Sequence, residues 1–149
     1  MLRVPQIKLS VKYSHEVLQS ELRQVSSSIE TYEVLKNCFD KDTFFMQEQF
    51  IILLLNQSNK IIGYHPLSTG GISSTVVDIR LIFATAIKSL ATSIIIAHNH
   101  PSGNLKASEA DKNITKKIKE AGEILDIKLI DHLILTSESY LSFADEFLL

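Results

Sequence analysis

The sequence is poor in cysteine: Cys38 is the only one among 149 residues. A single cysteine excludes an internal disulfide and every zinc motif built on cysteine pairs. Disulfides are typical of secreted proteins, so their absence favours the reducing cytoplasm as the compartment.

An excess of charge of one sign is also missing. The chain carries 15 basic and 17 acidic residues, for a formal net charge of −2 and a pI near 6.2. This balance gives no overall electrostatic footprint for nucleic acid or for an anionic membrane. Hydrophobic residues at 45% and charged residues at 21% are ordinary values for a globular protein. The length predicts one domain that buries a substantial core.

Long apolar runs are absent as well. The longest conspicuous run, Phe50–Leu55, is far shorter than the roughly 18 residues that a membrane-spanning helix needs. The first ten residues lack the uncharged apolar core of a signal peptide. We therefore expect a cytoplasmic protein without a membrane partner.

The hydrophobic periodicity predicts alternating strands and helices. In the first half of the chain we expect an edge strand over 6–13 with Lys8 and Lys12 facing water, helices near 15–25 and 28–39, and a hairpin of 50–55 with 61–64. A loop over 68–75 and a helix from Asp78 to about Leu90 should follow. In the last part we expect a strand over 93–98, a helix after Ser108, and strands over 128–135 and 140–143. This order predicts an α/β fold in which helices flank a mixed sheet.

Two histidines stand at the end of the predicted strand over 93–98. Side chains alternate across a strand with period two, so His98 and His100 project from the same face. Pro101 then ends the strand. The two imidazoles can converge on one point.

A carboxylate follows in the first turn of the next predicted helix, at Asp111. Two histidines and one carboxylate, with a fourth position left to water, are typical of a catalytic zinc site. Such a metal lowers the pKa of its bound water and polarises a carbonyl group, which suits hydrolysis. Alternatively, Ser108 and Asp111 form only a variant of the helix capping box. Capping, however, explains neither histidine.

At these residues the chain resembles a known family. The string His98-Asn-His-Pro, six residues, Ser108, two residues, Asp111 matches the JAMM (MPN+) metalloprotease signature at every fixed position. Together with 119–125 and 131–135, the segment 98–103 resembles the bacterial RadC-like branch, and the similarity covers roughly residues 45–143. The resemblance implies a curled mixed sheet of the JAB1/MPN, cytidine deaminase-like architecture over 45–149. Residues 1–44 would form an extension of an edge strand and helices packed on that domain.

The resemblance also implies a role for each site residue. His98, His100 and Asp111 would bind Zn²⁺, Ser108 would steady the oxyanion, and Glu48 would serve as general acid and base. Glu48 is selected because the family's glutamate likewise comes immediately before the first long strand. The implied function is a zinc-dependent metallopeptidase that cleaves peptide or isopeptide bonds with a metal-activated water.

Two other classes of function share features with this chain. A zinc nucleobase deaminase needs His-x-Glu followed by Pro-Cys-x-x-Cys, which one cysteine cannot supply. A DNA-repair or DNA-processing module with a structural metal is the alternative that the RadC resemblance suggests. Residues 1–44 lack the Gly-rich hairpins of the helix-hairpin-helix region that full-length RadC proteins carry. The lysines at 112, 116 and 119 share one helix face, which we expect to be solvated.

Asp131 and His132 are neighbours in a predicted strand and therefore point to opposite faces. At most one of them can look towards the metal. We expect either residue to be held by hydrogen bonds, with a supporting contact to a metal ligand as the functional possibility.

Overall fold

The computed structural model describes residues 3–70 and 76–149, and its centre is a five-stranded sheet in the order β2-β1-β3-β4-β5. The strands are β1 (Gln49–Leu55), β2 (Ile61–Thr69), β3 (Ser93–Asn99), β4 (Lys128–Leu135) and β5 (Tyr140–Ser142). Only β3 and β4 run parallel, whereas the pairs β1–β2, β1–β3 and β4–β5 are antiparallel. The sheet is therefore mixed, as the sequence predicted.

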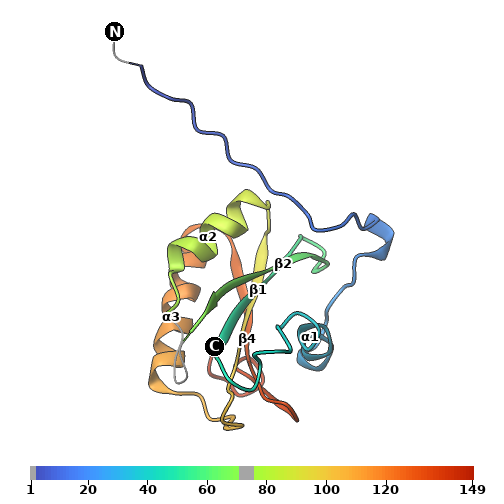
Figure 1. The fold of residues 1–149 in the computed structure, drawn as a ribbon, viewed down its shortest axis with the longest axis vertical. Helices are drawn as coiled ribbons and strands as arrows, with labels where there is room; N and C mark the ends of the chain where they lie inside the picture. The colour runs from blue at the N-terminus through green and yellow to red at the C-terminus, as the bar shows by residue number, and fades with distance from the viewer. Residues whose placement is uncertain (1–2, 71–75) are drawn as a thin grey trace.

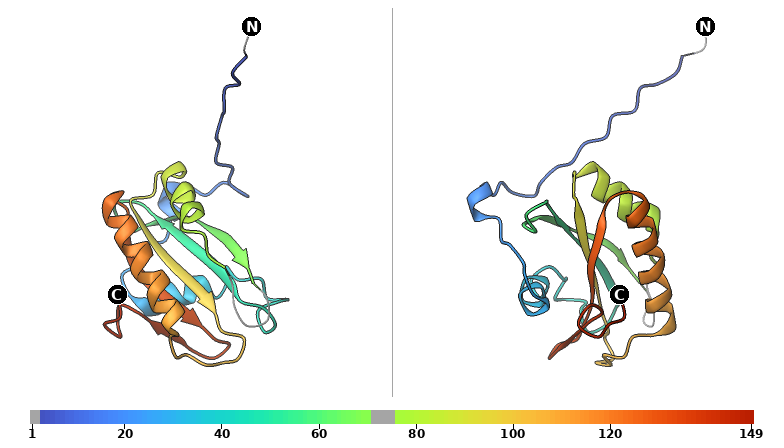
Figure 2. Two further views of the ribbon diagram at one scale, coloured as in Figure 1. Left: turned by 90° about the vertical axis from the view of Figure 1, so that its left-hand side faces the viewer. Right: turned by 180° about the vertical axis from the view of Figure 1, so that it is seen from behind.

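Helices cover both faces of this sheet. α1 (Ser28–Leu35) lies on one face, and α2 (Ile79–Lys88) and α3 (Glu109–Ile124) lie side by side on the other (Figure 1). The view from behind shows the same layers (Figure 2). Side-chain contacts agree, because Tyr32 and Leu35 of α1 pack in one apolar cluster while Ile82 and Ile118 pack in another. The predicted α/β class is confirmed.

The two central strands are buried along their whole length. Every residue of β1 and of β3 is buried, which explains their continuous apolar sequences, since both faces of a covered strand avoid water. Period-two alternation divides β1 between the faces. Phe50, Ile52 and Leu54 pack towards α2 and α3, whereas the residues between them pack towards α1.

The helix starts are set by local caps. Ser27 accepts a hydrogen bond from Glu30 N at the start of α1, and Asp78 accepts one from Arg80 N at the start of α2. Short polar side chains at this position satisfy backbone N–H groups that lack a partner within the helix. The predicted start of α2 after Asp78 is confirmed.

The expected edge strand over 6–13 is wrong. These residues form no regular secondary structure, and the segment runs away from the domain (Figure 2). Its apolar side chains stay in water, with Ile7 81% and Leu9 71% exposed. A strand requires a neighbour for its backbone hydrogen bonds, and within the described chain no strand pairs with this segment.

The expected helix over 15–25 is also wrong, since only a short 3₁₀ turn, η1 (Gln19–Glu21), forms there. The end of this stretch pairs with the start of β2 instead. Ile61 N donates to Arg23 O and Val25 N donates to Asn59 O, around an isolated bridge between Gln24 and Lys60. These tertiary backbone bonds replace the helical ones.

Two boundaries differ from the prediction. α1 ends at Leu35 rather than near Phe39, because Asn37 N and Cys38 N bond to carbonyls three residues back and tighten the last turn. The predicted loop over 68–75 begins later than expected, since Ser68 and Thr69 belong to β2. Residues 71–75 lie outside the described part of the chain.

Among the described residues, none of the helices combines the length and the apolar character needed to cross a bilayer.

Candidate metal centre

The candidate site begins at the carboxyl end of β3. His98 is the penultimate residue of that strand, lies buried, and faces α2 and α3 together with Phe50, its partner in β1. The Phe50 and His98 rings are nearly parallel, with centroids 6.2 Å apart. His100 follows one residue after the strand ends, and its backbone N–H donates to Leu135 O of β4 at 2.8 Å. The sheet therefore fixes both imidazoles.

Asp111 reaches the site from the first turn of α3. Its backbone N–H donates to Ser108 Oγ at 3.1 Å, and its Oδ2 accepts from Ser108 N and Ser108 Oγ at 2.8 and 2.7 Å. This reciprocal arrangement is a capping box, so the cap that the alternative interpretation assigned to Ser108 and Asp111 is present. The box occupies Oδ2, which also lies 3.8 Å from His100 Nε2, and leaves Oδ1 facing His98.

The three predicted ligands come together. His98 Nε2 lies 2.9 Å from His100 Nε2 and 3.2 Å from Asp111 Oδ1, and the ligand atoms of all three residues lie within 4.8 Å of one another. Ligand atoms around a tetrahedral zinc ion stand about 3.3 Å apart, given metal–ligand bonds of about 2.0–2.2 Å. The donor types and spacing therefore fit a metal ion, and the cluster can hold one.

The tautomer of His100 is set by the hydrogen bond of its Nδ1, the ring nitrogen that faces away from the cluster. His100 Nδ1 lies 2.6 Å from Asn104 O. A carbonyl oxygen only accepts, so Nδ1 carries the hydrogen and Nε2 presents its lone pair to the cluster. Gly103, with φ of +80°, makes the tight turn that brings Asn104 back to the ring.

Asp111 is ionised at neutral pH. Partial burial acts to raise the pKa of this carboxyl group, but the proximity of His98 and the hydrogen bonds from Ser108 hold the pKa well below its usual range. The carboxylate is thus in the form that binds a cation.

Asp131 and His132 point in opposite directions, as predicted. His132 Nε2 lies 2.8 Å from His98 Nδ1 beneath the cluster. Asp131 points away and accepts from His132 N, Ser142 Oγ and Ala144 N, which ties β4 to β5. Burial raises the pKa of Asp131 despite these bonds, and burial together with His98 lowers the pKa of His132 well below its ordinary value.

Glu48 lies directly before β1 and is half-buried. Its carbonyl oxygen accepts from Gly70 N at 2.8 Å. Phe50 pairs with His98 at the end of the antiparallel register of β1 and β3, and Glu48 stands two residues before Phe50. Glu48 and His100 therefore lie at the same end of the sheet, one directly before β1 and the other directly after β3.

Asn99, between the two histidines, was missed by the sequence analysis. It is fully buried and points to the α1 face, where Oδ1 accepts from Gln49 N at 2.6 Å. Its Nδ2 donates to Phe44 O at 2.7 Å and to Gln47 O at 3.0 Å. Asn99 therefore anchors the loop that joins α1 to β1, a role that required the tertiary structure to recognise.

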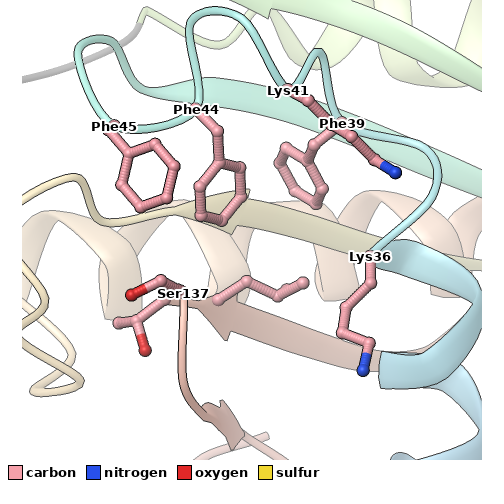
Figure 3. A pocket seen from close by; sticks show the side chains of 8 residues that line it. Lys36, Phe39, Lys41, Phe44, Phe45 and Ser137 are labelled. Carbon is pink, nitrogen blue, oxygen red and sulfur yellow. The ribbon is translucent and has the colours of Figure 1, made fainter.

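The anchored loop forms one wall of a hollow of about 290 Å³ on the α1 face. The rings of Phe39, Phe44 and Phe45 line up along this wall, with Ser137 across from them and Lys36 and Lys41 at one end (Figure 3). Leu135 and Thr136, at the end of β4, complete the lining. The hollow and the metal cluster thus lie at the same sheet end on opposite faces.

The fold and the cluster define an α/β domain of the JAB type with a candidate metal site. The family model of the RadC-like JAB domain matches residues 25–148, which is most of the chain. The protein belongs to the RadC-like JAB domain family. The mixed sheet with helices on both faces is the architecture expected of that family.

Curated relatives support the same assignment. A UPF0758 protein of Flavobacterium johnsoniae is 48% identical over 126 residues, which cover 85% of this chain and 54% of the relative. A UPF0758 protein of Porphyromonas gingivalis is 50% identical over 104 residues, which cover 69% of this chain and 46% of the relative. The present chain thus spans about half the length of the curated relatives it matches.

Proposed function

We propose that this domain is a zinc-dependent hydrolase, a metallopeptidase that cleaves peptide or isopeptide bonds. One observation carries the proposal: His98, His100 and Asp111 converge so that their ligand atoms lie within 4.8 Å of one another. Three protein ligands of the nitrogen and oxygen type, with a fourth position for water or substrate, distinguish catalytic zinc sites from closed structural ones.

The chemistry divides between the metal and two side chains. A zinc ion held by His98, His100 and Asp111 would lower the pKa of water and polarise a carbonyl group. We assign to Glu48, the residue directly before β1, the task of taking a proton from water and returning it to the departing amine. A protein or peptide is the substrate class that this chemistry serves.

Ser108 is the proposed donor to the oxyanion. Its hydroxyl hydrogen points to Asp111 Oδ2, so the hydroxyl must rotate away from the capping box to serve an oxyanion. The exposed position of Ser108 permits this rotation, and Ser108 N continues to hold Asp111 Oδ2 meanwhile. Loss of one such donor typically lowers kcat about 10²- to 10³-fold.

Metal analysis of the purified protein tests the proposal. After equilibration with zinc and removal of unbound ions, we expect about one zinc per chain, because the site takes one ion. His98→Ala removes a ligand and should abolish stoichiometric binding, whereas the exposed His65 of β2 provides a matched control, His65→Ala, that retains it. A wild-type protein that takes up no zinc would refute the proposed function.

Turnover tests the role of Glu48. Reporters with a linear peptide bond and with an isopeptide bond should be cleaved by the zinc-loaded protein. Glu48→Gln should lose this activity and keep its zinc, while Glu16→Gln, a change at an exposed residue, should match the wild type. Full activity of Glu48→Gln would remove Glu48 from the mechanism.

The surface charges give the DNA-associated alternative less support than the ligand cluster gives the proposed hydrolase. Lys112 pairs with Glu109 at 2.9 Å and Lys116 pairs with Glu120 at 3.9 Å, so neighbouring acids offset part of the lysine face on α3. Binding to DNA that weakens steeply with added salt would favour this alternative, because counterion release produces that dependence.

A further inference from the structure

A buried chain of hydrogen bonds runs beneath the metal cluster. It leads from the carbonyl oxygen of Asp111 to Thr115 Oγ1 at 2.5 Å, then to His132 Nδ1 at 2.6 Å, and from His132 Nε2 to His98 Nδ1 at 2.8 Å. His98 Nε2 faces Asp111 Oδ1 at 3.2 Å, which closes the ring of contacts. The proposed ligands His98 and Asp111 are therefore connected by two routes. One is their direct contact in the cluster, and the other runs through Thr115 and His132.

The direction of each hydrogen bond follows from the first one. The Asp111 carbonyl only accepts, so the single hydroxyl hydrogen of Thr115 points to it. Thr115 Oγ1 must then accept from His132, and this places a hydrogen on His132 Nδ1. The neutral ring has a bare Nε2, which accepts from His98 Nδ1.

Burial keeps His132 neutral in this chain. Its side chain is 0% exposed and lies between aromatic rings, with centroids 4.5 Å from Phe143 and 6.1 Å from Phe50. A positive imidazolium in such surroundings loses its hydration without gaining a facing carboxylate. Among the described residues, the side-chain partners recorded for the ring nitrogens of His132 are Thr115 and His98.

We propose that His132 is a positioning residue that holds His98 in the tautomer with hydrogen on Nδ1 and so delivers the Nε2 lone pair to the metal. His100 is fixed in the same tautomer by Asn104 O. Both Nε2 lone pairs then face each other at 2.9 Å, an arrangement that a shared cation stabilises. The inference rests on the proposed metal site, but the tautomer itself is measurable without metal or turnover.

The first test is the tautomer of His98 in metal-free protein. Long-range ¹H–¹⁵N spectra of histidine-labelled protein distinguish a protonated ring nitrogen from a bare one, and single substitutions assign the five histidines. At mildly alkaline pH we expect hydrogen on Nδ1 of both His98 and His132. A His98 Nδ1 without hydrogen, or the mixture of tautomers seen in free imidazole, would overturn the proposal even if the protein binds zinc.

The second test alters the chain without touching a proposed ligand. Thr115→Val keeps the shape but removes the acceptor for His132, so we expect zinc affinity to fall about 10- to 100-fold, the usual effect of losing a partner of a metal ligand. Thr115→Ser restores the hydroxyl and should restore the affinity. Equal zinc affinity in Thr115→Val and Thr115→Ser would contradict the proposed role of the hydrogen-bond chain.

A third variant covers the case in which Thr115→Val fails to fold. His132→Phe keeps an aromatic ring against Phe143 and removes the acceptor for His98 Nδ1. It should weaken zinc binding to the same degree and change the His98 spectrum. Phe143→Leu, which loses the stacked ring but no hydrogen bond, should lower stability and leave the His98 tautomer unchanged. An unaltered His98 spectrum in His132→Phe would overturn the proposal.

Discussion

The two faces of the sheet have opposite chemistry at the carboxyl end of β3. On the α2–α3 face, His98 and His100 meet Asp111 in a polar cluster. On the α1 face, Asn99 anchors a loop whose phenylalanines line an apolar hollow. His98, Asn99 and His100 thus serve both sides of the sheet, so strand alternation alone can separate a candidate metal site from its structural support.

The largest expected effect comes from the apolar side. Phe39 is 4% exposed and packs in the α1-side cluster, so Phe39→Ala should lower the free energy of unfolding by about 3 kcal/mol or more. Zinc stoichiometry should be unchanged if the faces are independent. Phe45→Ala is the matched control, because Phe45 is 68% exposed and its loss should cost under about 0.5 kcal/mol. Urea unfolding measures both, and loss of zinc from folded Phe39→Ala would show that the faces are coupled.

Zinc should raise the free energy of unfolding only through the cluster on the α2–α3 face of the sheet. At a free zinc concentration about 100-fold above Kd, the free energy of unfolding should rise by about 2.7 kcal/mol. Urea unfolding with and without zinc should show this gain in the wild type and in Asn99→Ala, but not in His98→Ala. The comparison between the faces fails if Asn99→Ala also loses the gain.

Asn99→Ala should lower stability by about 2 kcal/mol in the absence of zinc. The substitution leaves Gln49 N without its side-chain acceptor and two loop carbonyls without their donor, and unsatisfied buried polar groups are costly. Asn113→Ala, at an exposed position of α3, is the control and should change stability little. A stability equal to the control would mean that water replaces the anchor.

The last effect concerns the thiol of Cys38 on the α1 side and leaves stability near neutral pH unchanged. Burial raises the pKa of Cys38 to about 11 from an ordinary 9.0, so its thiolate fraction near pH 8 falls about 100-fold. Alkylation in the folded protein should be slower than in urea by a similar factor. The pKa of the Cys38 thiol is higher in the folded state than in the unfolded state. Its contribution to the free energy of unfolding is therefore fully present below about pH 9 and is lost between about pH 9 and pH 11. Alkylation at equal rates in both states would contradict the burial of Cys38.

The sequence predicted the elements whose signals are local. The apolar runs of β1 and β3 identified buried strands, and period-two alternation was enough to put His98 and His100 on one face. The spacing to Asp111 followed from the helix start at Ser108. These inferences succeeded because strand alternation and helix capping operate within a few residues.

Other features depend on pairing between distant segments. Residues 6–13 have the alternation of a strand, but the described sheet offers them no neighbour, and period two alone cannot reveal that. Thr115 carries no motif, and its contact with His132 spans 17 residues of sequence. Asn99 also looked unremarkable, because its partners lie about 50 residues away. Such contacts exist only once the sheet is assembled.

The capping box at the start of α3 links metal binding to the thermal fraying of that helix end. Asp111 both secures the first turn of its helix and offers an oxygen to the cluster, so fraying of that turn withdraws the oxygen at the same moment. An ion seated among the three residues would resist that fraying in return. Heat should therefore loosen the ion and the helix end together, in one cooperative step well before the buried strands separate.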